Sequence, residues 1–222
     1  MTAPRIEILP DPDAVARRAA SFVAEQARAA ATDHERFTFA VSGGRTPWAM
    51  FAHLADEDVP WSQTAVYQVD ERVAPAGDPD RNLAHLVESL PARAEADIHP
   101  LPVEEDDLDA AAARYARSLP ERFDLVHLGL GPDGHTASLV PGDPVLEVSD
   151  RDVALTKTYM GRRRMTLTYP ALNRARQVLW LVTGEDKVDA LRRLQAGDRS
   201  IPAGRVVASS ALIIADAAAA AR

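Results

Sequence analysis

Cysteine is absent from this chain of 222 residues. Its absence excludes disulfide bonds, thiolate metal ligands and a cysteine nucleophile. Basic residues are in the minority, with 25 Lys and Arg against 33 Asp and Glu and a formal net charge of -8. Binding to nucleic acid needs a basic face, so nucleic acid is not expected as a partner. A few local cations are still enough to bind one small anion.

Long apolar runs are also missing. No segment reaches the roughly 18 apolar residues that a membrane-spanning helix needs. Met1–Leu9 lacks the charged region and the long apolar stretch of a signal peptide. We therefore expect no membrane partner and a cytoplasmic location.

Aromatic residues make up only 5% of the chain, so the core must consist mainly of Ala, Val, Leu and Ile. Hydrophobic residues amount to 46% and charged residues to 26%, which is typical of a globular domain. Internal repeats and low-complexity linkers are not found. We expect one domain over residues 1–222, and the sequence is compatible with a monomer or a small homo-oligomer.

Strand-like and helix-like segments alternate along the chain. The expected strands are Arg5–Leu9, Phe37–Val41, Thr64–Val69, Asp124–Leu130, Met165–Thr168, Gln177–Thr183 and Ala211–Ala215. The expected helices run from Asp11 to about Ala31, from Pro47 onward, over Asp80–Leu90, Leu108–Leu119 and Glu185–Gln195, and from a cap at Asp216 through the last alanines. This order predicts a three-layer, Rossmann-like α/β fold with a mostly parallel central sheet flanked by helices.

Three unusual loops each follow an expected strand: Ser42–Pro47, Asp70–Pro75 and Gly129–Ser138. The carboxyl ends of parallel strands meet at one edge of a sheet, where such folds bind ligands. We therefore expect the three loops to converge on one site.

The first loop has the features of an anion site. Gly43 and Gly44 let the backbone approach a ligand closely, and the following helix offers free N–H groups. Ser42 and Thr46 add hydroxyl groups. The spacing matches neither the nucleotide-binding GxxxxGK[ST] pattern nor the dinucleotide-binding GxGxxG pattern. A plain turn between a strand and a helix is the alternative interpretation.

The second loop combines two acids and a base in Asp70-Glu71-Arg72. Such a group can bind a sugar and polarise a carbonyl. The alternative is an ordinary cluster of surface ion pairs, which contributes little.

The third loop presents Asp133 and His135 between glycines and a proline. Histidine is well suited to remove a proton from water near neutral pH, and a neighbouring carboxylate can orient its ring. The alternative is a loop histidine bonded to backbone. We interpret His127, inside the preceding strand, as a packed or edge histidine and not as a catalyst. No His, Asp or Glu spacing predicts a metal site.

Two further basic segments contain candidates for anion binding. Arg162, Arg163 and Arg164 stand together, and we interpret the first two as solvated charges. Lys187 lies at the start of an expected helix, where the simpler interpretation is a surface lysine.

Taken in order, these motifs resemble the 6-phosphogluconolactonase family. The matching segments are SGGRTP (42–47), DERVAP (70–75), GLGPDGHTASLVPG (129–142), RMTLTYPALN (164–173) and VTGEDK (182–187). Ala74, Asn82 and Val140 depart from residues that are frequent in the family. The resemblance implies a fold shared with glucosamine-6-phosphate deaminases and ribose-5-phosphate isomerase-like proteins, the substrate 6-phospho-D-glucono-1,5-lactone, and no cofactor.

The resemblance also assigns roles. It implies that Gly43, Gly44, Arg164 and Lys187 hold the phosphate. Arg72 and Asn82 would face the sugar, and His135 would be the base with Asp133 beside it.

Other activities are also compatible with the motifs. An amino-sugar phosphate deaminase or isomerase would use Asp70 and Glu71 to move protons, although Arg72 directly after them favours a lactonase. A non-catalytic sugar-phosphate sensor would not need Asp133 and His135. A dinucleotide-dependent enzyme is not favoured, because GxGxxG is absent.

Overall fold

The computed structural model describes residues 4–90 and 94–221, so Met1–Ala3 of the expected N-terminal segment lie outside the described residues. Its centre is a seven-stranded sheet with the order β1-β10-β9-β6-β2-β3-β5 and parallel pairing throughout. The strands are β1 (Arg5–Leu9), β2 (Phe37–Val41), β3 (Thr64–Gln68), β5 (Asp97–His99), β6 (Leu125–Gly129), β9 (Gln177–Val182) and β10 (Ser210–Asp216).

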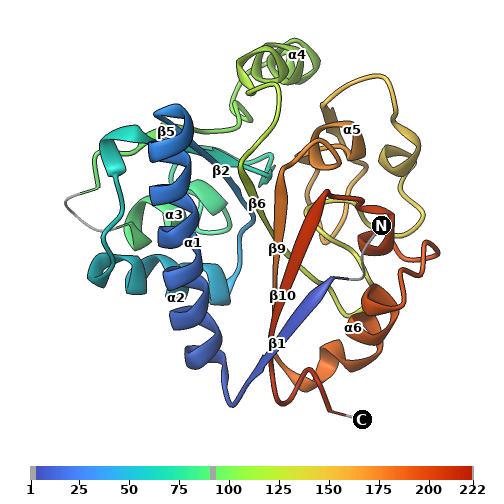
Figure 1. Ribbon diagram of the computed structural model, residues 1–222. Helices are drawn as coiled ribbons and strands as arrows, with labels where there is room; N and C mark the ends of the chain where they lie inside the picture. Colours follow the sequence, from blue (N-terminus) through green and yellow to red (C-terminus); the bar gives the residue numbers. More distant parts are fainter. Residues whose placement is uncertain (1–3, 91–93, 222) are drawn as a thin grey trace.

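Helices cover both faces of this sheet (Figure 1). On one face are α1 (Pro12–His34), α2 (Arg45–His53) and α3 (Asn82–Ser89), which pack in one apolar cluster with Phe39 and Leu125. On the other face are α4 (Leu108–Ser118), α5 (Tyr169–Leu172) and α6 (Val188–Gln195), which share a second cluster with Val126 and Leu128. The expected three-layer α/β fold is confirmed.

Both faces of the inner strands are therefore buried. In β6 the side chains of Leu125 and Val126 point to opposite faces, and both are fully buried. Strands covered on both faces have continuous apolar sequences, and this is why β2, β6 and β9 could be recognised from sequence.

A second, antiparallel sheet of three strands has the order β4-β8-β7. It consists of β4 (Asp70–Arg72), β7 (Val153–Leu155) and β8 (Arg164–Leu167). Arg72 lies directly opposite Arg164 in the β4–β8 ladder. Only β8 was expected, because the polar Asp70-Glu71-Arg72 has no apolar pattern and forms a strand by pairing with a distant segment.

Several predicted helix ends differ from the structure by two or three positions, and one predicted helix is wrong. Helix α2 begins at Arg45, two positions before the expected Pro47. The expected C-terminal helix is wrong, since residues 217–220 form a turn. Asp216 does accept the N–H of Ala219, at 2.7 Å, but it also accepts the N–H of Gly184, at 3.1 Å. One turn of alanines is too short to propagate as a helix.

Short 3-10 turns complete the fold: η1 (Leu54–Asp56), η2 (Trp61–Gln63), η3 (Pro144–Glu147), η4 (Glu185–Lys187) and η5 (Ala203–Arg205). Of the helices in residues 4–90 and 94–221, none combines the length and the apolar character needed to cross a membrane.

Candidate active site

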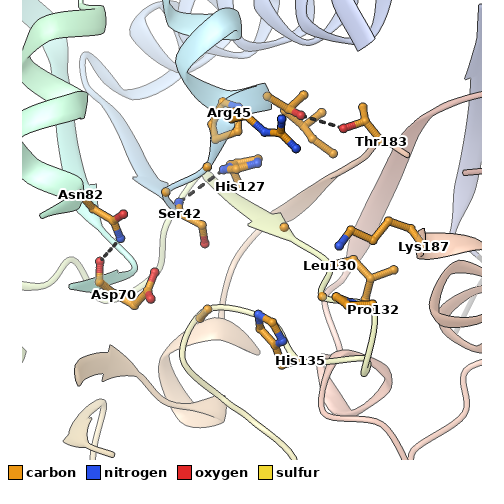
Figure 2. A pocket seen from close by; sticks show the side chains of 18 of the residues that line it. Ser42, Arg45, Asp70, Asn82, His127, Leu130, Pro132, His135, Thr183 and Lys187 are labelled. Carbon is orange, nitrogen blue, oxygen red and sulfur yellow. Dashed lines mark hydrogen bonds between the residues drawn. The ribbon is translucent and has the colours of Figure 1, made fainter. Parts of the chain in front are cut away.

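A cleft of about 300 Å³ opens at the carboxyl ends of β2, β6 and β9 and beside β4 and β8 (Figure 2). The three loops converge there, as expected from the parallel sheet. All but one of the predicted site residues line it: Ser42, Gly43, Gly44, Thr46, Asp70, Arg72, Asn82, His135, Arg164 and Lys187. The exception, Asp133, contacts one of them.

The loop between β2 and α2 has a backbone that requires glycine. Gly44 caps α2 with φ of 137°, a conformation that side chains disfavour. A Cβ atom on Gly43 would lie 2.0 Å from Oδ1 of Asn82. No side chain caps α2, so its first N–H groups are available to a ligand at the positive end of the helix dipole. The hydroxyl groups of Thr46 and Thr183 lie 2.9 Å apart beside this turn.

Glu71 is fully buried and binds backbone. Its carboxylate accepts the N–H groups of Arg72, Asn82 and Leu83, each at 2.8 Å, and lies 3.2 Å from Nε of Arg81. The alternative of a surface ion-pair cluster is therefore wrong for Asp70-Glu71-Arg72. Glu71 fixes the start of α3 and does not line the cleft.

Asp70 and Arg72 do line the cleft. The buried carboxylate of Asp70 accepts a hydrogen bond from Oγ of Ser138 at 2.6 Å. The Arg72 guanidinium donates to Oδ1 of Asn82 and, at 3.0 Å, to the carbonyl of Asp80. Asn82 thus lies against both Arg72 and the glycine loop.

His135 and Asp133 form a close pair. Nδ1 of His135 lies 2.5 Å from Oδ1 of Asp133, which also accepts the His135 backbone N–H at 3.1 Å. In this arrangement Nδ1 carries the proton, and the lone pair of Nε2 is left free. A Cβ atom on Gly131 would lie 2.1 Å from Nδ1, so glycine is required there. Figure 2 shows His135 across the cleft from Ser42.

The Asp133 carboxyl group is charged. Partial burial raises the pKa of Asp133, but the hydrogen bonds from His135, and the charge of its ring when protonated, lower it more, and the net pKa lies below the usual value. Asp133 is therefore placed where a carboxylate can orient the ring and stabilise an imidazolium.

Arg164 is the buried cation of the site. The Nε atom of Arg164 has no hydrogen-bond partner. No carboxylate among residues 4–90 and 94–221 forms an ion pair with the guanidinium group. Burial lowers its pKa, and the nearby charge of Asp70 opposes this effect. The other two arginines of the run lie outside the cleft: Arg162 pairs with Asp78 at 2.8 Å, and Arg163 is exposed.

Lys187 enters the cleft from η4 (Figure 2). Its Nζ lies 2.8 Å from the exposed carboxylate of Asp186. Lys187 is partly exposed and lines the same cleft as Arg164, so its role as a phosphate ligand stays a prediction.

Comparison with known proteins places the chain in one family. The family model of the glucosamine-6-phosphate isomerases and 6-phosphogluconolactonase matches residues 10–214. The chain belongs to this family. A 6-phosphogluconolactonase of Synechocystis is 36% identical over 210 residues, which cover 87% of this chain and 86% of the relative.

Solved structures of the family agree with the fold. A 6-phosphogluconolactonase from Shewanella baltica superposes with a TM-score of 0.88 at 27% identity, covering 96% of this chain and 98% of the other. A monomeric glucosamine-6-phosphate deaminase superposes with a TM-score of 0.86 at 17% identity, covering 97% and 98%. Both branches of the family thus share this architecture, and the fold alone does not separate them.

Arg45 was missed as a site residue by the sequence analysis. It is exposed at the first position of α2 and lines the cleft. Within the described part of the chain, its side chain forms no hydrogen bond or ion pair. Figure 2 shows it entering the cleft opposite Lys187. Its place directly after Gly44 in the predicted anion loop was the available signal.

His127 is a packed histidine, as expected, in the interior of the sheet and not at its edge. It is fully buried, and Nδ1 accepts the N–H of Ser42 at 3.3 Å. Burial lowers its pKa to about 3, so the ring is neutral. The buried ring lines the cleft and is bonded to the glycine loop through Ser42.

Metal ligands do not gather in the described residues. There, no group of three or more His, Cys, Asp or Glu side chains is arranged to hold a metal ion.

Proposed function

We propose that this chain hydrolyses 6-phospho-D-glucono-1,5-lactone to 6-phospho-D-gluconate, the second step of the oxidative pentose phosphate pathway, by general-base activation of water. The observation that carries the proposal is the contact between His135 and Asp133 at a cleft whose other walls hold cations. The cytoplasmic location and the single domain over residues 1–222 stay predictions.

The cations support a place for the phosphate group. Arg164 and Lys187 line the same cleft as the glycine loop, and Arg45 adds a third charge at the start of α2. The free backbone N–H groups at the N-terminus of α2 complete an anion site. Bound there, the phosphate would direct the lactone ring toward His135 and Arg72.

The reaction needs one base and one oxyanion site. Nε2 of His135 takes a proton from water, and the water oxygen attacks the C1 carbonyl. Arg72 or loop N–H groups stabilise the oxyanion that develops. The bond between C1 and the ring oxygen then breaks, and that oxygen receives the proton from the imidazolium. Asp133 stabilises the imidazolium in between. One positioned base is worth about 10²–10⁴-fold.

The environment of Glu71 argues against the deaminase or isomerase alternative. Its carboxylate is occupied by the backbone N–H groups of Asn82 and Leu83 and by Arg72. Only Asp70 of the acidic pair borders the cleft and could move protons there.

Direct measurement of lactone hydrolysis tests the proposal. Glucose-6-phosphate dehydrogenase generates the lactone, and excess 6-phosphogluconate dehydrogenase reports the product. We expect a rate above the spontaneous blank that falls at least about 10²-fold in His135→Ala. A rate equal to the spontaneous blank would refute the proposed lactonase activity. Ammonia release from glucosamine 6-phosphate would support the deaminase instead, and tight sugar-phosphate binding without turnover would support a sensor.

A further inference from the structure

Tyr159 occupies a tight turn that extends the β7–β8 hairpin. Its N–H donates to the carbonyl of Arg162 at 2.9 Å, and the Arg162 N–H donates back at 3.3 Å. Met160 and Gly161, between them, have φ of 50° and 80°. Two successive residues with positive φ are typical of a two-residue hairpin turn. The turn gives Tyr159 a defined position beside the site.

The Tyr159 ring contacts two functional side chains at once. The guanidinium carbon of Arg164 lies 5.2 Å from the ring centroid. The ring of His135 lies 5.8 Å away, centroid to centroid, with an interplanar angle of 64°. One aromatic ring therefore bridges the proposed base and the proposed phosphate ligand.

Arg164 depends on this contact. It is 9% exposed and has no carboxylate partner among the described residues. A cation over an aromatic face is attracted by the ring quadrupole, more strongly when water is excluded. Without the ring, the guanidinium would lose a main lateral support.

His135 gains a second constraint in the same way. Its hydrogen bond to Asp133 holds Nδ1 but leaves the ring free to tilt about the line between the two atoms. An edge contact with Tyr159 restricts the tilt and thus the direction of the Nε2 lone pair. Aromatic edge contacts of this kind are favourable beyond the area that they bury.

The turn is itself anchored. Arg162 pairs with Asp78 at 2.8 Å and with Asp80 at 3.2 Å, both in the segment before α3. Asp80 also accepts a hydrogen bond from Arg72 through its carbonyl. The turn that carries Tyr159 is thereby tied to the segment before α3, which in turn is bonded to Arg72 of the cleft.

We propose that Tyr159 is a positioning residue that fixes His135 relative to Arg164, and so fixes the attacking base relative to the phosphate group of the substrate. The inference rests on the proposed function of these two residues. Misplacement of a reacting group by about 1 Å can cost 10²-fold in rate, so a fixed spacing between them has kinetic value.

Two substitutions test the role of the ring. Tyr159→Phe keeps both ring contacts, and we expect kcat and KM to stay within twofold of the parent. Tyr159→Leu removes the ring, and we expect kcat to fall about tenfold and KM for the phosphorylated lactone to rise severalfold. Met160→Ala, at an adjacent side chain that is 80% exposed, is the matched control and should leave both constants unchanged.

Two readouts separate positioning from general stability. In Tyr159→Leu, the His135 ring protons should lose an aromatic ring-current shift in the NMR spectrum, while the thermal midpoint changes little. In an Arg164→Met background, Tyr159→Leu should raise KM by less than it does alone, because contacting residues are non-additive.

Several results would overturn the inference: unchanged constants and NMR shifts in Tyr159→Leu, an equal loss in Tyr159→Phe, or full additivity with Arg164→Met. Tyr159→Met is the second non-aromatic variant if the leucine variant does not fold. His135→Ala and Arg164→Met are measured alongside. If both keep parental kinetics, the roles assigned to His135 and Arg164 fail, and the positioning role fails with them. If only the Tyr159 variants keep parental kinetics, the positioning role alone fails. A parent rate equal to the spontaneous blank would refute the proposed function itself.

Discussion

The carboxylate of Glu71 accepts the backbone N–H of Asn82 at 2.8 Å and thereby fixes the residue that packs against the glycine loop. The same carboxylate binds the next N–H, that of Leu83, and faces the buried Arg81. Glu71 does not line the cleft, but it binds the backbone of Arg72 and Asn82, which do.

Glu71→Ala should therefore destabilise the fold. The change leaves backbone N–H groups without a partner and Arg81 without its buried counter-charge. We expect a loss of about 3 kcal/mol in the free energy of unfolding. Urea denaturation measures it, with Glu104→Ala as the control, since Glu104 is the exposed partner of Arg81. A loss below about 1 kcal/mol would contradict the structural role of Glu71.

Asp133→Asn should lower kcat by about 10- to 100-fold with little change in KM. The amide still fits beside Nδ1 of His135 but no longer stabilises an imidazolium. Steady-state kinetics on the lactone measure the effect. A change confined to KM would indicate that Asp133 binds substrate and does not support the base.

The pH dependence of stability gives a second check on Asp133. Its pKa is lowered in the folded protein, so the charged form stabilises the fold above the unfolded pKa, and this contribution is lost as pH falls through the folded pKa. The stability difference between the parent and Asp133→Asn should shrink as pH falls below about 4. A difference that is constant from pH 7 to pH 3 would contradict the ion pair.

Arg45→Gln should raise KM for the phosphorylated lactone about 5- to 10-fold and leave kcat unchanged. A cation that binds the phosphate equally in the ground and transition states affects KM alone. The effect should weaken as salt is added, because the side chain is exposed. Arg163→Gln, at another exposed arginine that does not line the cleft, is the control. Equal effects of the two substitutions would remove Arg45 from the site.

His127 should make the fold sensitive to acid. With a pKa of about 3 in the folded protein, it stays neutral where the unfolded chain binds a proton, below about pH 6.5. The unfolded state then binds more protons, so stability falls with decreasing pH by up to about 1.4 kcal/mol per unit. His127→Leu should flatten this slope between pH 6.5 and 4 in denaturation curves, and an unchanged slope would contradict the neutral state.

The sequence predicted the parts of the fold that depend on local pattern. The apolar sequences of β2 and β9 could be recognised as strands because both of their faces are buried. Gly43 and His135 were chosen as candidates because their loops follow such strands. Strands β4, β5 and β7 were missed, because such short segments become strands only through pairing with a neighbouring strand. The Tyr159 contact was missed for a related reason: it depends on a hairpin turn that brings separate segments of the chain together.

Arg164 could be chosen among three neighbouring arginines only through the family resemblance. The structure explains why Arg164 differs from its neighbours. It lies opposite Arg72 in the β4–β8 ladder and is buried, whereas Arg162 forms an ion pair with Asp78. Alternation along a strand could have separated Arg163 from Arg164, but only once the strand was known to begin at Arg164.

The ladder pairing of Arg72 with Arg164 also has a consequence for the lifetime of the protein. Like charges directly opposite one another on neighbouring strands repel, and no carboxylate of the described chain forms an ion pair with either side chain. An anion seated between them would add to the negative charge that Asp70 supplies near Arg164. A ligand at a hundred times its dissociation constant adds about 2.7 kcal/mol to folding. Resistance to heat and proteolysis should therefore follow the supply of sugar phosphate, so that the enzyme persists longest when its substrate is abundant.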